Sequence, residues 1–225
     1  MTQNSNAITM SLFDQTSDDT STRKEELCPG AFVLHGFALQ DETVLLNAFH
    51  EVTAKAPFRH MVTPGGFRMS VAMTNCGSLG WITDRTGYRY DVIDPESGQL
   101  WPPMPAPFLK LAQDAAAEAG FAGFVPDACL VNRYGAGAKL SLHQDKDERD
   151  FTAPIVSVSL GIPAVFLFGG MNRADKTKRV PVSHGDVIVW GGPARLRYHG
   201  VLPLKEAQHP LLGEYRVNLT FRKAG

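Results

Sequence analysis

The segment Cys129-Leu130-Val131-Asn132-Arg133-Tyr134, followed at once by Gly135-Ala136-Gly137, sets the pattern for the second half of this chain of 225 residues. A short apolar and aromatic run that ends in a glycine turn is typical of a β-strand. The pattern returns toward the C-terminus, and further strands are expected at Ile155–Leu160, Ala164–Phe168, Asp186–Trp190 and Tyr215–Arg222. Short strands with frequent glycine turns favour a sandwich or a barrel.

Two helices are expected upstream of these strands. Apolar residues recur at helical spacing over residues 41–56, with Asp41 as a candidate N-cap. A second helix is expected over residues 105–119, with Gly120 at its end. Together with a first strand at 31–35, this order predicts an α+β fold, a double-stranded β-helix (jelly roll) with flanking helices.

Composition limits the class of protein. The net charge is −1, which argues against a generally basic protein that coats nucleic acid. The three cysteines form no Cys-x-x-Cys pair, so neither a disulfide framework nor a zinc–thiolate site is indicated. No secretory signal and no apolar stretch of transmembrane length is visible. We therefore expect a cytoplasmic protein with no membrane partner.

The chain divides into a tail and one domain. Residues 1–29 are polar, and we expect a flexible N-terminal tail there. Residues 30–225 form the expected domain, with the jelly-roll core at 128–225. Between the two helices, residues 57–101 combine turn signals with aromatic and methionine side chains. This segment is either a hairpin-rich cover over a site or ordinary β-structure with its own small core.

His143-Gln144-Asp145 is the first of three groups that could carry chemistry. Residues two apart on a strand point to the same face, so His143 and Asp145 could bind one metal ion. His199 is preferred as a third ligand because it follows a buried strand and comes just before a turn, whereas His184 precedes what looks like a tight turn into a strand and is expected to have a turn role. Two histidines and one carboxylate leave open positions on the metal, as in non-haem iron(II) oxygenases. An H-x-D pattern alone also fits a hydrogen-bonded structural histidine.

The second group is the alternating strand at 216–222, whose polar face carries Arg216, Asn218, Thr220 and Arg222. That face could be the solvated side of a half-buried strand, or it could point into a barrel. Inside a barrel the two arginines would need anionic partners, and a dicarboxylate would meet that need.

The third group is Asn132 and Tyr134, which share a face on the preceding strand. Both side chains can form hydrogen bonds with an oxygen-rich ligand. The three groups together would supply a metal site, an anion clamp and neutral polar anchors. A cosubstrate with a carboxylate at one end and a chelating 2-oxo acid at the other would join the metal to the clamp.

With these groups in their order along the chain, the sequence resembles the AlkB family of iron(II)/2-oxoglutarate dioxygenases. The resemblance is specifically to the bacterial nucleic-acid dealkylation repair type. The resemblance covers roughly residues 30–225. It is carried by the stretches 61–66, 69–77, 142–148, 154–160, 189–192 and 216–222. The acidic N-terminal tail is longer than the resemblance leads us to expect, and we match no counterpart to it.

The resemblance implies a role for each group of residues. The iron ligands would be His143, Asp145 and His199, which form the catalytic set together with Arg222. The 2-oxoglutarate anchors would be Asn132, Tyr134, Arg216, Asn218 and Arg222. Of the arginines, Arg216 would hold the distal carboxylate and Arg222 would lie near the carboxylate on the metal.

The resemblance also makes residues 57–101 a nucleotide-recognition lid, called the lid segment below. The substrate contacts would be Thr63, Met69, Met73, Trp81, Tyr88, Asp147 and Arg173. Trp81 and His143 would sandwich the damaged base, and Asp147 would lie near its exocyclic amino group.

The activity implied by the resemblance uses iron(II), 2-oxoglutarate and O2. It is the oxidative demethylation of N-alkylated bases of the 1-methyladenine and 3-methylcytosine type, with release of formaldehyde, succinate and CO2. The expected partner is alkylated DNA, single- or double-stranded, with RNA as a further candidate. The expected enzyme is a monomer that repairs alkylation by direct reversal, and its target base must leave the stack or be single-stranded already.

Three other interpretations use the same residues. The same chemistry could act on tRNA or on a protein side chain. A jelly-roll binding module could hold a structural metal without oxidation, although a metal store needs no dicarboxylate clamp. A metal-dependent isomerase on a cupin-like barrel would be expected to have more histidines at the metal.

Overall fold

The computed structural model describes residues 23–225 of the chain. Within them lie the helices α1 (Glu42–Lys55) and α2 (Ala106–Glu118) and the short 3-10 helices η1 (Leu39–Asp41) and η2 (Gly192–Ala194). The strands are β1 (Lys24–Cys28), β2 (Ala31–Leu34), β3 (Ala72–Gly77), β4 (Gly80–Asp84), β5 (Gly87–Asp91), β6 (Ala128–Tyr134), β7 (Leu140–His143), β8 (Ile155–Gly161), β9 (Ala164–Phe168), β10 (Lys178–Val182), β11 (Val187–Trp190), β12 (His199–Val201) and β13 (Arg216–Arg222).

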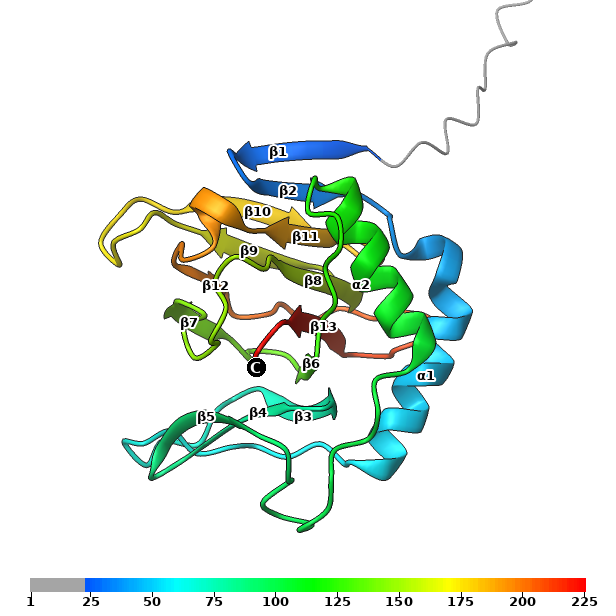
Figure 1. The fold of residues 1–225 in the computed structure, drawn as a ribbon. Coiled ribbons are helices and arrows are strands. Elements are labelled where there is room, and N and C mark those ends of the chain that lie inside the picture. The colour runs from blue at the N-terminus through cyan, green and yellow to red at the C-terminus, as the bar shows by residue number, and fades with distance from the viewer. Residues whose placement is uncertain (1–22) are drawn as a thin grey trace, which may run out of the picture.

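The strands form two main sheets and one hairpin. The larger sheet has seven strands in the order β1-β2-β11-β8-β13-β6-β3, and the smaller has four in the order β10-β9-β12-β7. Strands β4 and β5 pair only with each other among the described residues. Figure 1 shows both helices against one side of the larger sheet, with the smaller sheet on the other side. This is the predicted α+β jelly roll with flanking helices.

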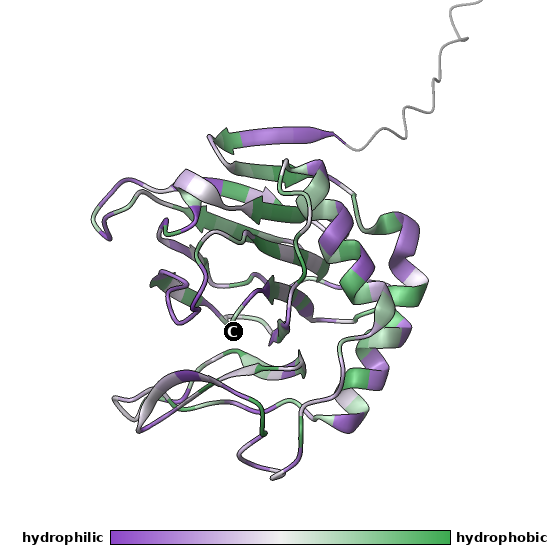
Figure 2. Cartoon of the chain, in the orientation of Figure 1, coloured by the Kyte–Doolittle hydropathy of each residue, from purple (hydrophilic) through white to green (hydrophobic). Residues whose placement is uncertain are grey.

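Apolar side chains fill both spaces between these layers. Leu45 of α1 and Phe108 of α2 belong to the core between the helices and the larger sheet. Phe166 and Trp190 belong to a second core, between the two sheets. Figure 2 shows the hydrophobic colouring concentrated on these strands and on the inner sides of the helices. Burial on both faces explains why many strands of the larger sheet carry almost continuous apolar runs.

Strand β13 decides between the two interpretations of its polar face. All seven of its residues are buried. Val217 and Leu219 pack into the core beneath the helices, so the alternate residues point to the opposite side, between the sheets. The solvated interpretation is therefore wrong, and Arg216 and Arg222 are buried charges that need partners.

The helices lie close to their predicted positions. Asp41 is the N-cap residue of α1, but its side chain makes no capping hydrogen bond. Gly120 follows the end of α2 with φ of 91°, a left-handed conformation that favours glycine. Helical spacing of apolar residues was thus a sound guide to both elements, while the capping chemistry at Asp41 was not.

The predicted tail at residues 1–29 needs a correction at its C-terminal end. Lys24–Cys28 is strand β1, which pairs with β2 at the edge of the larger sheet. Its charged sequence concealed the strand, because an edge strand can expose charged side chains and still use its backbone for pairing. Residues 1–22 lie outside the described part of the chain.

The lid segment is divided between two structures. Strand β3 extends the larger sheet and pairs with β6 along its whole length, which the weak sequence pattern did not predict. The β4–β5 hairpin forms no ladder with either main sheet, although β4 lies beside β3 in the lower part of Figure 1. Side-chain contacts, described below, link it to the loop that follows β7.

Among residues 23–225, no helix combines the length and the apolar character needed to cross a membrane.

Candidate active site

The three predicted metal ligands meet in the smaller sheet. His143 is the last residue of β7, His199 is the first of β12, and the two are direct partners in the antiparallel ladder. Asp145 lies two residues beyond the end of β7. One ligand atom from each of the three lies within 4.8 Å of the others. The geometry therefore supports His199 as the third ligand, while His184 accepts a hydrogen bond from Gly161 and contacts Glu42 instead.

Gly200 allows the strands that carry the two histidines to approach each other. A Cβ atom at this position would lie 2.7 Å from the carbonyl oxygen of Leu140 on β7, closer than real Cβ contacts. The register of β12 on β7 also shifts between His199 and Val201. The glycine after His199 is thus a steric requirement of the close approach of β12 and β7.

Backbone carbonyls orient both imidazole rings. The Nδ1 atom of His143 lies 2.9 Å from the carbonyl oxygen of Ser141, and that of His199 lies 3.0 Å from the carbonyl oxygen of Arg197. Because a carbonyl only accepts, each Nδ1 carries the proton and donates it. In a neutral ring of this tautomer, Nε2 has a lone pair for a metal ion. These Nε2 atoms lie 3.6 Å (His143) and 3.7 Å (His199) from the carboxylate oxygens of Asp145.

Asp145 is kept ionised by its neighbours. Burial by itself would raise the pKa of its carboxyl group, but the Arg222 guanidinium, with smaller effects from His199 and His143, holds that pKa well below the usual range. Arg222 donates from Nε at 2.9 Å and from Nη2 at 2.7 Å to one carboxylate oxygen. Asp145 can therefore offer its other oxygen to a cation at any ordinary pH.

His199 is kept neutral. Burial, with a smaller effect from nearby His143, lowers its pKa from 6.5 to about 3. Its ring packs 4.4 Å from that of His143 and 4.9 Å from that of Trp190. A neutral imidazole is the form that binds metal, so no proton competes at this ligand near neutral pH.

Arg216 is a buried cation with unused hydrogen-bond donors. Its Nη2 donates to Ser159 at 2.8 Å, and its guanidinium lies 4.9 Å from the centre of the Tyr134 ring. Its Nε and Nη1 have no partner among the described residues. Burial lowers the pKa of this guanidinium. A buried guanidinium with two free donors suits a carboxylate bound through both oxygens.

The two predicted amide anchors are also paired across the sheet. Asn132 on β6 faces Asn218 on β13 and donates to its side-chain oxygen at 3.2 Å. Asn218 in turn donates to the Ser157 hydroxyl at 2.8 Å and to the Val158 carbonyl at 2.9 Å. The side-chain oxygen of Asn132 is buried without a hydrogen-bond donor from any residue in 23–225. The two amides are therefore held in place beside Arg216, and the side-chain oxygen of Asn132 can still accept a hydrogen bond.

One cavity of about 820 Å³ contains all of these groups. It is lined by every residue predicted for the site, namely Thr63, Met69, Met73, Trp81, Tyr88, Asn132, Tyr134, His143, Asp145, Asp147, Arg173, His199, Arg216, Asn218 and Arg222. Sequence segments far apart in the chain therefore converge on one space, although the individual roles of these residues stay predictions. A space of this size accepts a small cosubstrate and part of a larger substrate.

The lid segment contributes the aromatic wall of this cavity. The Trp81 and Tyr88 rings stack 5.8 Å apart with an interplanar angle of 20°. The indole nitrogen of Trp81 donates to the Asp147 carboxylate at 2.9 Å. One ring face of Trp81 is therefore covered by Tyr88, and Asp147 is held at the edge of the indole.

Three residues near the metal ligands, two of them buried, were missed in the sequence. Glu148 is 6% exposed and accepts a hydrogen bond from Arg195 at 3.1 Å and one from the Tyr90 hydroxyl at 2.6 Å. It also lies 3.4 Å from the Arg222 guanidinium. In the sequence, the signal for Glu148 was that it directly follows Asp147, in the same short segment as the H-x-D motif. Acidic residues are common in exposed loops, so this signal is weak. Its partners could only be found in three dimensions.

The residues present fit an iron ion and 2-oxoglutarate. Two imidazoles, of which His199 is kept neutral, and one ionised carboxylate provide the donor set of a facial triad. The unpartnered donors of Arg216, in the same cavity, provide what a distant carboxylate needs. When bound, the metal would be held by His143, Asp145 and His199. The diacid would be held by Arg216 together with the amides of Asn132 and Asn218.

Comparison with known proteins gives the family. The family model of the 2OG-Fe(II) oxygenase superfamily matches residues 30–222 of this chain. The chain is 58% identical over 206 residues to the alpha-ketoglutarate-dependent dioxygenase AlkB of Salmonella typhimurium (strain LT2), covering 92% of this chain and 95% of that protein. It is 57% identical over 207 residues to the protein of the same name from Escherichia coli (strain K12), covering 92% and 96%.

A solved structure described as OsALKBH1 is also similar. It superposes with a TM-score of 0.77 at 32% identity and covers 89% of this chain and 100% of that one. The predicted jelly-roll dioxygenase with iron(II), 2-oxoglutarate and O2 is thereby confirmed, and neither a non-oxidising binding module nor an isomerase is supported. From its fold, its cavity and its relatives, this chain belongs to the AlkB family of iron(II)- and 2-oxoglutarate-dependent dioxygenases.

Proposed function

We propose that this enzyme removes alkyl groups from N-alkylated nucleobases of the 1-methyladenine and 3-methylcytosine type. DNA, single- or double-stranded, is the proposed substrate, and RNA is a second candidate. The observation that carries the proposal is that a single cavity joins the metal triad to a wall formed by two stacked aromatic rings and a carboxylate. A flat cationic ring fits such a wall through stacking and charge.

The proposed reaction is the oxidation of an N-alkyl carbon. Iron(II) with 2-oxoglutarate and O2 supplies this oxidation, and 2-oxoglutarate leaves as succinate and CO2. The oxidised methyl group then leaves nitrogen as formaldehyde, which restores the base. Methylation at adenine N1 or cytosine N3 blocks Watson–Crick pairing, so it also lowers the cost of extruding the base from a duplex.

The protein's own residues bind and orient the reactants. Arg216 and the amides of Asn132 and Asn218 would fix one end of the diacid, and Arg222 would hold Asp145 toward the metal. Trp81 would stack on the base, opposite the His143 ring. Asp147, held by the Trp81 indole, would accept a hydrogen bond from an exocyclic amino group and favour a ring that carries positive charge.

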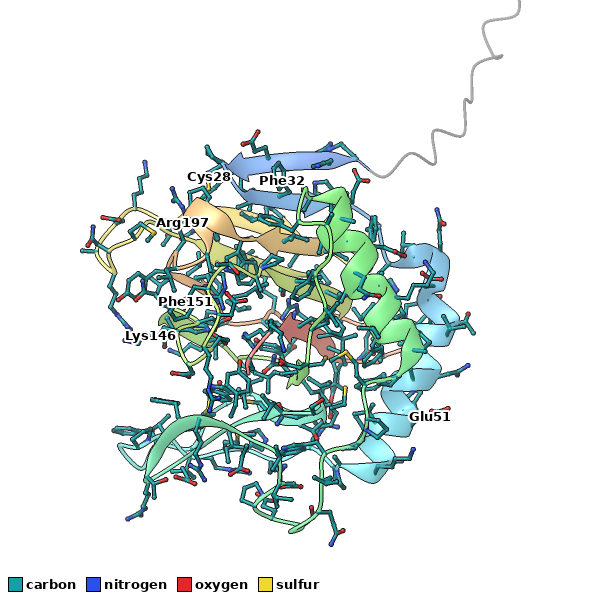
Figure 3. The ribbon with its side chains drawn as sticks, viewed as in Figure 1. Cys28, Phe32, Glu51, Lys146, Phe151 and Arg197 are labelled. Atoms are coloured by element: carbon teal, nitrogen blue, oxygen red, sulfur yellow. The ribbon has the colours of Figure 1, made fainter. Side chains whose placement is uncertain are left out.

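Basic side chains around the cavity support a nucleic-acid substrate. Arg68, Lys139, Lys146 and Arg173 all line it. Figure 3 shows Lys146 at the open side of the molecule, away from the helices. Positive charges around a base pocket suit phosphate contacts, which position a strand without reading its sequence.

The test is turnover of defined oligonucleotides. DNA and RNA strands that carry one 1-methyladenine or one 3-methylcytosine are incubated with enzyme and 2-oxoglutarate, with and without iron(II). Formaldehyde, succinate and the restored base are measured together, with unmethylated strands and the Asp145→Ala enzyme as controls. We expect iron-dependent formaldehyde and restored base from the methylated strands. Succinate formed with a methylated peptide, and no formaldehyde from any strand, would show that the substrate assignment is wrong.

A further inference from the structure

The β4–β5 hairpin is attached to the short loop that carries the metal ligand Asp145. Trp81 and Tyr90 are direct partners across the hairpin, so their side chains share a face. Trp81 donates to Asp147 and Tyr90 donates to Glu148, at 2.9 and 2.6 Å. Two neighbouring acids, two and three residues past Asp145, thus receive the two side chains of one cross-strand pair.

Glu148 is the more deeply buried of these acids and contacts two arginines. Its side chain is 2% exposed, lies 3.1 Å from the Arg195 Nη2 atom and lies 3.4 Å from the Arg222 Nε atom. Arg222 also binds the side chain of Asp145, and Arg195 donates to the backbone oxygen of Asp145 at 2.8 Å. Glu148 therefore holds both guanidinium groups that fix the metal ligand, although it does not line the cavity itself.

The charges of this cluster balance without any ligand. Asp145 and Glu148 contribute two negative charges, and Arg195 and Arg222 contribute two positive charges. Iron(II) adds two positive charges to the adjoining cavity and 2-oxoglutarate adds two negative ones. Because the cluster is buried, salt screens these interactions weakly. Loss of the Glu148 charge alone would leave one excess positive charge close to the metal site.

We propose that Glu148 is a positioning residue with two effects: it sets the charge balance shared by the metal and the diacid, and through Tyr90 it fixes the β4–β5 hairpin relative to the metal. Both effects depend on the iron and 2-oxoglutarate chemistry of the family, and neither depends on which base is oxidised.

The charge effect predicts opposite changes in two affinities. Glu148→Gln keeps the size and a hydrogen-bonding amide but removes the charge. Mn²⁺ affinity of the metal-free enzyme should fall at least about tenfold, because like charges repel in a medium of low dielectric constant. The affinity for 2-oxoglutarate, measured at saturating Mn²⁺, should stay equal or increase. Glu51→Gln, on the outer side of α1 (Figure 3), is the matched control and should change neither.

A purely structural role gives a different result. General loosening of the site by Glu148→Gln would weaken the binding of Mn²⁺ and of 2-oxoglutarate together, and that outcome would overturn the charge effect. An unchanged Mn²⁺ affinity would overturn it as well. Both measurements use binding alone, so they decide the matter even if no methylated strand is turned over.

The hairpin effect is tested with Tyr90→Phe, which removes one hydroxyl and no charge. Backbone hydrogen exchange of residues 80–91 is measured before and after addition of Mn²⁺ and 2-oxoglutarate. We expect the ligands to slow exchange in the natural enzyme and in the control Tyr215→Phe, and to leave it unchanged in Tyr90→Phe, while both ligand affinities stay within about twofold. Ligand protection retained in Tyr90→Phe, or absent from the natural enzyme, would refute the link.

Discussion

Replacement of Arg216 by methionine should make the ligand-free enzyme more stable and unable to bind 2-oxoglutarate. Arg216 is 2% exposed, and its Nε and Nη1 have no protein partner within residues 23–225. A buried charge without a partner is costly, and its exchange for an apolar side chain of similar length gains about 1–3 kcal/mol in comparable sites. For a domain of this size that corresponds to a rise in Tm of roughly 3–10 °C.

The ligand-bound state should show the reverse. Loss of one partner of a buried, doubly hydrogen-bonded ion pair costs about 3–5 kcal/mol. This converts to a Kd for 2-oxoglutarate that is weaker by a factor of roughly a hundred to several thousand. At about one hundred times its Kd, the ligand stabilises the natural enzyme by about 2.7 kcal/mol, whereas the same concentration should barely shift the Tm of the variant.

Two measurements are needed for this prediction. Thermal unfolding is followed by circular dichroism with Mn²⁺ present, with and without 2-oxoglutarate, and affinity is measured by calorimetry. Arg133→Met is a suitable control, because Arg133 stacks on Phe58 and Tyr215, away from the cavity. It should not increase stability and should not alter 2-oxoglutarate binding. A lower Tm for ligand-free Arg216→Met, or an intact shift with 2-oxoglutarate, would refute the reasoning.

Three further predictions concern the metal site and the aromatic wall. Asp145→Ala removes the only carboxylate of the triad and the hydrogen-bond acceptor of Arg222, so formaldehyde release should fall to background; normal release would reject the assignment. Trp81→Ala removes a stacking contact worth about 1–3 kcal/mol, so the KM for a methylated strand should rise roughly tenfold or more with metal and 2-oxoglutarate binding largely spared, and an unchanged KM would count against stacking. In the metal-free enzyme, the folded pKa of His199 is about 3 against 6.5 when unfolded. The unfolded state therefore binds the extra proton, and stability should be complete above pH 6.5 and decline toward pH 3, with a slope that is reduced in His199→Asn as measured by urea unfolding.

The sequence predicted the parts of the site whose geometry follows from local spacing. His143 and Asp145 are two residues apart and lie together in the structure, and Arg216 and Asn218 share a face because β13 alternates. His199 was preferred from its local sequence context, but its position opposite His143 depends on the register of β12 against β7, which spacing does not give. The family resemblance supplied the roles of the individual residues, which the sequence pattern alone left open.

Other features depended on tertiary structure and were not predicted. Strand β1 is formed by a charged edge sequence, which no apolar pattern reveals. The Tyr90–Glu148 contact joins residues 58 positions apart, and neither residue is unusual in its own segment. Whether an acidic residue is buried depends on the path of the whole chain. The residues next to Glu148 in the sequence therefore do not predict that it is buried.

The position of β3 limits how the enzyme can be re-engineered. This strand occupies the outer edge of β6, whose other neighbour is β13 with its two arginines. Excision of all of residues 57–101 would expose the β6 backbone as an open pairing edge, which invites intermolecular strand addition and aggregation. An exchange of base preference between relatives should therefore transplant only the hairpin beyond Gly77 and keep 72–77 as a protective border strand.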